Sequence, residues 1–303
     1  MKDKKLFKAT LAALITNVIF GFSFLFSKVA LDYAHPLLIL SVRFFVAFLI
    51  LSILWLCGVF KLSFKGKPKG RILLMALAQP LCYYIFELYG IDMCSSAMSG
   101  VIISIVPVVV IILSTLFLHE RPSGVQIVFS LISLLAVAAI SIMSDDGAQS
   151  SPVGILLLCG AVICAAVFNI LSRDLSSEYS AIERTYVMFF AGSVGFLITA
   201  ITSLGGDFLS ELSRAAGAPM FWGAIAYLSV ASSIIAFLLY NYSTSVLTPV
   251  RSASFSNLIT VVSVMAGIFI LKENMSLPQL ICCALIILGV IGTNRDTSKN
   301  KGK

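Results

Sequence analysis

The chain has 303 residues, of which 59% are hydrophobic and only 12% are charged. A soluble globular domain carries about 25% charged residues, so this composition excludes a water-soluble domain. Apolar stretches of about 20 residues, the length of a bilayer span, recur along the whole chain. The sequence therefore predicts an all-α integral membrane protein whose solvent is the lipid bilayer.

Ten spanning helices are predicted, joined by short polar breaks. In chain order we expect them near 9–31, 37–60, 72–91, 95–118, 125–143, 153–172, 182–204, 219–241, 247–271 and 277–294. Clear breaks are "KLSFKGKPKGR" at 61–71, "SDDGAQSSP" at 144–152 and the segment 203–219. The last break is long enough to hold a short surface helix.

The basic residues are distributed unevenly over the predicted loops. With a cytoplasmic N-terminus, all but four of the 21 Lys and Arg residues fall on the cytoplasmic side, the exceptions being Lys28, Arg43, Arg214 and Lys272. Cytoplasmic loops of membrane proteins are enriched in Lys and Arg. We therefore expect both termini in the cytoplasm of a multi-pass protein of the cell membrane. The net charge of +7 follows from this topology, and no nucleic-acid partner is expected.

Two charged turns of similar sequence separate long apolar runs, "LHERPSGVQ" at 118–126 and "LKENMSLPQ" at 271–279. One constant shift aligns three polar pairs: Glu120 with Glu273, Ser123 with Ser276, and Gln126 with Gln279. A single match would mean little in so apolar a chain, but the three together indicate a repeat. We expect the glutamate of each turn to cap the following helix, whose N-terminal end favours a carboxylate.

The repeat divides the chain into two homologous halves, 9–143 and 153–294, with five predicted helices each. Because five is odd, the second half enters the membrane in the opposite direction to the first. Inverted repeats of this kind are the architecture of secondary transporters, which bind their substrate near the bilayer midplane between the repeats. The predicted fold is therefore two inverted five-helix repeats around a central cavity.

Several short motifs carry a resemblance to a known family. "NVIFGFSFLFSK" at 17–28, "VRFF" at 42–45, "SIVPVV" at 104–109 and the two charged turns resemble the EamA family of the drug/metabolite transporter superfamily. The resemblance covers nearly all of both halves and implies a ten-helix bundle that moves small metabolites by alternating access. The second half departs from the family pattern, with Ala166, Met188 and Thr260 at three motif positions.

Ionisable groups inside a bilayer are costly unless they are paired or hydrated, so each is a candidate for function. Arg43 is placed about 9 Å inside the second span and Glu87 about 6 Å inside the third, at 1.5 Å per residue. Both lie near the outer ends of their spans, so they can meet at one depth. Together they form either an outer gate, an anchor for a zwitterionic substrate, or a structural ion pair.

A polar stripe continues from Glu87 toward the midplane. Gln79, Tyr83 and Glu87 follow at helical spacing on one face, and Tyr84 lies beside them. Pro80 lacks a backbone donor and can kink the helix. The stripe suits either a cavity wall or contacts between helices, and we include all four polar residues among the candidate substrate-binding residues.

The second half supplies further candidates. Tyr240 occupies the repeat position of Glu87, and Asn241 follows it. Ser256 and Asn257 lie on or near one face of the ninth span, and Asn169 lies in the sixth. Small polar residues also mediate close helix packing in membranes, so packing is the alternative for each of them.

The predicted function is transport of small, amino-acid-like metabolites across the cytoplasmic membrane. No Walker A motif is present, so ATP is not the direct energy source. A membrane enzyme would need a catalytic motif such as GxSxG or HExxH, which the sequence lacks, and no cofactor or metal is expected. A channel is the remaining alternative. The oligomeric state stays open, a homodimer included.

Overall fold

The computed structural model describes residues 2–67, 69–94, 96–120, 122–143, 151–271 and 276–295. Every regular element in these ranges is a helix. Nine helical runs within them are long and apolar enough to cross a membrane. The tenth predicted span corresponds to a run of shorter helices at 249–271. The predicted all-α membrane fold is confirmed.

The first half contains five consecutive helical runs that match the predicted spans. Their elements are α1 (Lys2–Leu31), α2 (Pro36–Leu56), α3 (Lys69–Ala76), the π-helical turn η1 (Leu77–Cys82), α4 (Tyr83–Asp92), α5 (Ser96–Ile103), α6 (Val106–Phe117) and α7 (Gly124–Met143). The third run consists of α3, η1 and α4, and the fourth consists of α5 and α6.

The second half repeats this arrangement. Its elements are α8 (Pro152–Asp174), η2 (Leu175–Ser177), α9 (Ala181–Leu204), η3 (Gly205–Asp207), α10 (Phe208–Ala216), α11 (Pro219–Ala226), η4 (Tyr227–Ile235), α12 (Ala236–Val246), α13 (Pro249–Ser254), η5 (Phe255–Asn257), α14 (Leu258–Leu271) and α15 (Leu277–Arg295). The surface helix expected within 203–219 is α10. A π-helical turn interrupts the third run of each half, η1 in the first and η4 in the second.

Three predicted helix bounds are wrong. The first span was expected to begin near residue 9, but α1 begins at Lys2. The second span was expected to reach residue 60, but α2 ends at Leu56 because Gly58 takes a positive φ of 76° and turns the chain. Backbone donors of the turn then satisfy the last carbonyls of α2, with Val59 N donating to Leu54 O at 3.0 Å. The eighth span continues beyond its predicted end at residue 241 to Val246.

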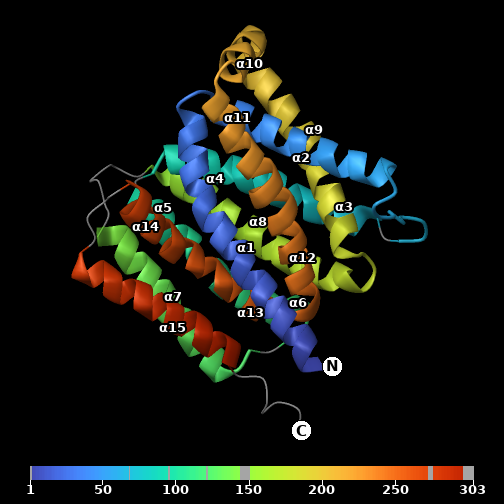
Figure 1. The fold of residues 1–303 in the computed structure, drawn as a ribbon. Helices are drawn as coiled ribbons and strands as arrows, with labels where there is room; N and C mark the ends of the chain where they lie inside the picture. The colour runs from blue at the N-terminus through green and yellow to red at the C-terminus, as the bar shows by residue number, and fades with distance from the viewer. Residues whose placement is uncertain are drawn as a thin grey trace.

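The packing of the helices follows a two-fold pattern. α2 packs against α9, and α7 packs against α15, so the second and the fifth runs of the two halves meet their own counterparts. The first run of each half lies along the third run of the other, α1 along α12 and α8 along α4. Figure 1 shows α7 and α15 side by side. This exchange is what two inverted repeats produce when they interlock.

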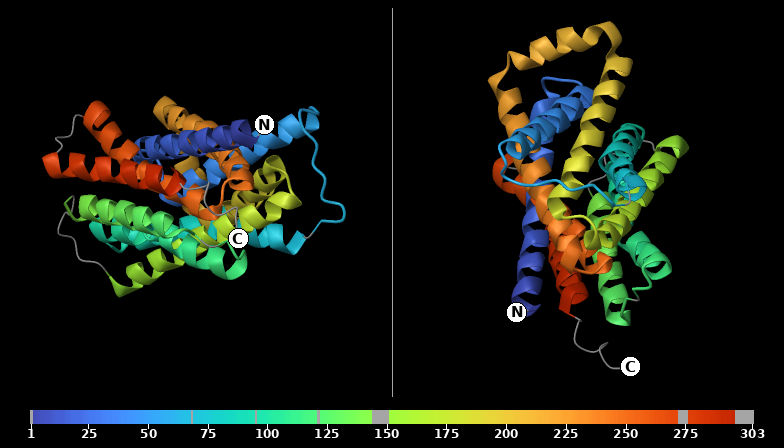
Figure 2. Two further views of the ribbon diagram at one scale, coloured as in Figure 1. Left: turned by 90° about the horizontal axis from the view of Figure 1, so that it is seen from below. Right: turned by 90° about the vertical axis from the view of Figure 1, so that its right-hand side faces the viewer.

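The bundle has two distinct ends. α1 begins and α15 ends at one of them, which we call the N/C end, and α10 lies at the opposite end (Figures 1 and 2). Successive runs alternate in direction. The segment after α2, the turn after α6 and the connection from α8 to α9 therefore all lie at the N/C end.

Small residues permit close contact between α7 and α15. A Cβ atom on Gly289 would lie 2.7 Å from the Ser133 Cβ and 2.8 Å from the Phe129 carbonyl oxygen. Side chains without bulk let membrane helices approach closely and gain van der Waals contact. Gly289 therefore contributes to the junction between the two halves by leaving room for the α7 backbone.

The repeated turns cap equivalent helices, but through serine and glutamine. At the start of α7 the Gln126 backbone N–H donates to Ser123 Oγ at 3.2 Å, and the Ser123 N–H donates to Gln126 Oε1 at 3.0 Å. At the start of α15 the Ser276 N–H donates to Gln279 Oε1 at 3.0 Å. The prediction that Glu120 caps α7 is wrong, because Arg173 holds its carboxylate. Glu273 lies outside the described residues.

Candidate functional site

A polar and aromatic cluster lies where α2, α4 and η4 meet. We call it the Arg43 cluster; its members are Arg43, Tyr83, Tyr84, Glu87, Ser232 and Ser233. Arg43 is the eighth residue of α2 and Glu87 is the fifth of α4, so both lie in the half of the bundle nearer the end opposite the N/C end. Helices of both halves therefore build this cluster.

Arg43 is held by the second half of the chain. Its Nε donates to Ser233 Oγ at 2.9 Å and its Nη2 donates to Ser232 Oγ at 3.0 Å. The guanidinium carbon lies 5.5 Å from the centre of the Tyr84 ring and 5.3 Å from that of Phe44. Such cation–π contacts stabilise a cation that has lost its water. The Arg43 side chain is thus buried, at 5% exposure, among hydroxyls and rings.

Within the described part of the chain, Glu87 forms a hydrogen bond with Tyr83 and no ion pair with Arg43, the partner considered from the sequence. The Tyr83 hydroxyl donates to Glu87 Oε1 at 2.7 Å. Arg43 and Glu87, both within the described residues, form no ion pair, although they lie within Coulombic range of each other. The pairing of Arg43 with Glu87, one of the sequence-based alternatives, is therefore not what the structure shows.

The predicted stripe on the third span is shorter than expected. Tyr83 and Glu87 share a face, as their hydrogen bond shows, but Gln79 leaves the helical conformation with φ −146° and ψ 125°. The break falls next to Pro80, which cannot donate to the helical ladder. Gln79 is half-buried and does not continue the face of Tyr83.

Three side chains of the cluster keep accessible surface. Tyr83, Tyr84 and Glu87 are each half-buried, unlike Arg43 and the two serines. Tyr240 of α12 is half-buried as well. These four polar side chains are therefore the candidates best placed to meet a solute.

Tyr240 and Asn169 form a second polar contact between α12 and α8. The Tyr240 hydroxyl donates to Asn169 Oδ1 at 2.5 Å, and the Tyr240 ring stacks on Phe168 with centroids 5.5 Å apart. Asn169 Nδ2 donates back to Ala165 O at 2.9 Å. The pair of Tyr240 and Asn169 is therefore oriented by its surroundings, with Asn169 buried and Tyr240 half-buried.

The remaining candidates are used in packing. Asn241 is fully buried: it accepts from Ser172 Oγ at 2.9 Å and its Nδ2 donates to Thr185 Oγ1 at 2.9 Å. Asn257 Nδ2 donates to Ser133 Oγ at 2.8 Å, which joins η5 to α7. Ser256 donates to the carbonyl of Ala253 one turn earlier. From the sequence, these residues could not be distinguished from residues that bind a solute. A small polar residue in an apolar span can serve either helix packing or binding.

Sequence reasoning missed Arg184, which it counted only among the basic residues of the cytoplasmic side. Arg184 is fully buried in the first turn of α9 and donates to Asn241 O at 2.5 Å, to Ser245 Oγ at 2.6 Å and to the Ser172 carbonyl. It ties α9 to α8 and α12 near the N/C end. Arg184 lies just inside the start of a predicted span. Counting the basic residues on each side of the membrane does not reveal that one of them is buried.

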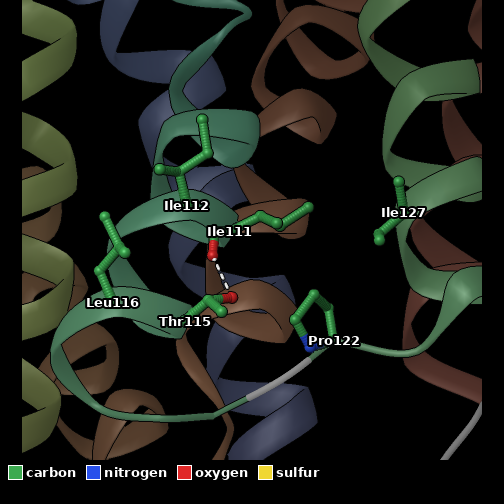
Figure 3. A pocket seen from close by; sticks show the side chains of 6 residues that line it. All are labelled: Ile111, Ile112, Thr115, Leu116, Pro122 and Ile127. Atoms are coloured by element: carbon green, nitrogen blue, oxygen red, sulfur yellow. Dashed lines mark hydrogen bonds between the residues drawn. The ribbon is translucent and has the colours of Figure 1, made fainter.

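An apolar groove on the outside of the bundle is a poor alternative site. It encloses about 400 Å³ and is lined by Ile111, Ile112, Thr115, Leu116, Pro122 and Ile127. Figure 3 shows that the Thr115 hydroxyl donates to the Ile111 carbonyl, at 2.9 Å, within the same helix. The lining thus offers a polar ligand little to bind, whereas the Arg43 cluster offers both signs of charge.

The fold and the cluster define a class, a multi-pass helical membrane protein of two inverted repeats with charged groups between its halves. The model of the EamA-like transporter family matches residues 7–142 and 152–295. The chain therefore belongs to the EamA-like transporter family.

Curated relatives agree with that family, and a solved structure shares the fold of this chain. The chain is 31% identical to the uncharacterized transporter YcxC of Bacillus subtilis (strain 168), covering 96% of this chain and 94% of the relative. It is 25% identical to a probable terminal-alkyne amino-acid exporter of Streptantibioticus cattleyicolor, covering 97% and 95% respectively. A crystal structure with 16% identity superposes with a TM-score of 0.77 over 94% of this chain and 96% of that one, which shows the shared fold.

Proposed function

We propose that this protein is a secondary transporter that moves small, amino-acid-like metabolites across the cytoplasmic membrane by alternating access. One observation carries the proposal: the Arg43 cluster joins α2 and α4 of the first repeat to η4 of the second. Inverted-repeat transporters bind their substrate between repeats and rock one against the other around the site. The exporter among the relatives supports amino-acid-like solutes and outward transport.

The π-helical turns support the same mechanism. η1 and η4 interrupt the third run of each repeat, and Ser232 and Ser233, the partners of Arg43, both belong to η4. Single π-helical turns inside α-helices occur frequently at functional sites. A change in the packing of η4 against α2 would alter the position of Arg43, which couples the site to the relative movement of the halves.

Counterflow in proteoliposomes tests the proposal. Purified protein is reconstituted into vesicles loaded with unlabelled amino acids, and a trace of labelled amino acids is added outside. A carrier that alternates between two sides gives a transient accumulation of label above equilibrium, because the internal pool returns the site outward. Glu87→Gln should abolish most of this accumulation, and Glu178→Gln, which changes an exposed carboxylate, should not.

Equilibration without the transient would indicate a channel. No flux of amino acids would refute the proposed solute class, and no flux of any metabolite in a broader panel would refute transport by alternating access. Folding of each variant is checked by its thermal unfolding in detergent, so loss of flux is separated from loss of structure.

A further inference from the structure

Because Arg43 and Glu87 have no ion-pair partner among the described residues, we propose that the site recognises a zwitterion, with a carboxylate bound at Arg43, which the two serines orient, and an ammonium bound at Glu87 and Tyr83. This inference rests on the proposed function and assigns each end of the solute to named groups. It concerns how the solute is held and leaves the direction of transport open.

The cation half is incomplete without an external acceptor. A guanidinium carries five N–H donors, and Arg43 uses Nε and Nη2 on Ser233 and Ser232. A further polar neighbour is the Tyr84 hydroxyl, which is neutral, and no described carboxylate lies within ion-pair distance. A buried cation needs an anionic partner to offset the loss of its hydration. The solute would supply that partner.

The serines add direction to this half-site. Each accepts from Arg43 through its oxygen, and both serines are fully buried, so they hold the guanidinium in place behind the half-site. Consecutive positions on η4 bring both hydroxyls to the same guanidinium. A guanidinium held in this way can form the paired N–H···O bonds that bind the two oxygens of a carboxylate.

The anion half is incomplete in the same way. Glu87 Oε1 accepts from the Tyr83 hydroxyl, and Oε2 accepts no hydrogen bond from the described residues. Tyr83 therefore fixes the orientation of the carboxylate and leaves one oxygen for a cation. The Tyr84 ring lies between the two halves, 5.5 Å from the Arg43 guanidinium carbon and 5.3 Å from the Tyr83 ring centre.

The spacing favours one molecule that carries both charges. Arg43 and Glu87 are too far apart for an ion pair, whose limit is 4.0 Å, and the Tyr84 ring lies beside the Arg43 guanidinium. A solute that carries both a carboxylate and an ammonium would give each group a partner at once. A solute with only one charge would leave the other buried group without a partner, which costs free energy.

Binding of three sets of compounds to the detergent-solubilised full-length protein tests the inference. The sets are L-α-amino acids, their amides, which keep only the ammonium, and the matching acids without the amine, which keep only the carboxylate. Ligands that bind the folded state raise its apparent stability, so thermal shift ranks the sets and titration gives dissociation constants. Amino acids should bind most tightly.

Two substitutions separate the ends. Arg43→Gln should weaken binding of the amino acids and the amine-free acids by about tenfold or more and leave the amides unchanged, as expected for a lost charged hydrogen bond. Glu87→Gln should weaken the amino acids and the amides and spare the amine-free acids. Glu178→Gln is the control and should change none of them.

A further variant covers the case in which Arg43→Gln fails to fold. The double variant Ser232→Ala, Ser233→Ala keeps the arginine, and it should weaken amino acids and amine-free acids several-fold but not amides. Equal binding of amides and amino acids, or equal sensitivity of all three sets to each variant, would overturn the zwitterion assignment. Failure of all three sets to bind would also overturn it, while counterflow with other metabolites would still test transport.

Discussion

Glu183→Gln should destabilise the junction of the two halves at the N/C end. Glu183 is 4% exposed and accepts from Lys67 Nζ through both oxygens, at 3.0 and 2.9 Å. The backbone N–H groups of Ser63 and Ser180 also donate to it, each at 2.8 Å. The pair of Lys67 and Glu183 therefore joins the segment after α2, in the first half, to the start of α9, in the second.

The magnitude follows from burial. Breaking a fully buried ion pair by removing one partner costs about 3–5 kcal/mol, but the Lys67 side chain is 23% exposed, so water offsets part of the loss. In the wild type, Glu183 Oε2 accepts hydrogen bonds from both the Ser180 N–H and Lys67. A glutamine side-chain NH₂ group at that position is a donor and cannot accept them. We expect a loss of about 2 kcal/mol in the free energy of unfolding, which lowers Tm by several degrees.

Thermal unfolding in detergent measures the effect, and a double-mutant cycle isolates the pair. The cycle compares Lys67→Met, Glu183→Met and the double variant, because replacing both charges removes the unpaired ion that each single change leaves. The double variant should be less destabilised than the sum of the singles by about 1 kcal/mol or more. The reasoning fails if Glu183→Gln unfolds like the wild type, or if the cycle shows no coupling. The exposed Glu178→Gln should be neutral.

Two predictions concern topology and helix packing. Reporter fusions after residues 66, 147 and 303 should read inside, outside and inside, because Lys and Arg then concentrate in the cytoplasm; an outside reading at 303 would contradict the number of spans. Gly289→Ala should destabilise the protein by about 1–3 kcal/mol in a thermal or denaturant titration, since the added methyl group meets the α7 backbone. Gly223→Ala, where nothing lies within 4 Å, is the matched control and should not destabilise; equal effects of the two would refute the packing argument.

Three ion pairs at the N/C end connect the repeats. Besides Lys67 with Glu183, Arg71 pairs with Asp174, and Arg173 Nε lies 3.3 Å from Glu120 Oε1. Each joins the first half to the second. Glu120 thus contributes to the contact between the halves, which explains its presence between two apolar runs better than helix capping does.

The sequence by itself determined the class and the order of the fold. Spans and breaks follow from local hydrophobicity, since each span must be apolar over the thickness of a bilayer. The one shift shared by three polar pairs of the two charged turns was enough to indicate the repeat, and Ser123 and Ser276 stand at the starts of equivalent helices. An odd number of spans per repeat then required the inversion. These inferences depend on local composition and on the number of spans in each repeat. They require no knowledge of which residues are in contact.

Only the tertiary structure decided which polar groups meet. The sequence predicts Arg43 and Glu87 at one depth, but it does not predict that Arg43 donates to Ser232 and Ser233, about 190 positions later in the chain. Local pattern cannot predict such a contact, because it depends on how α2 crosses η4 of the other repeat. The backbone break at Gln79 also depends on its surroundings, since a proline permits a kink without requiring it. Partner choice in a bilayer is set by helix crossing, which hydrophobic periodicity does not encode.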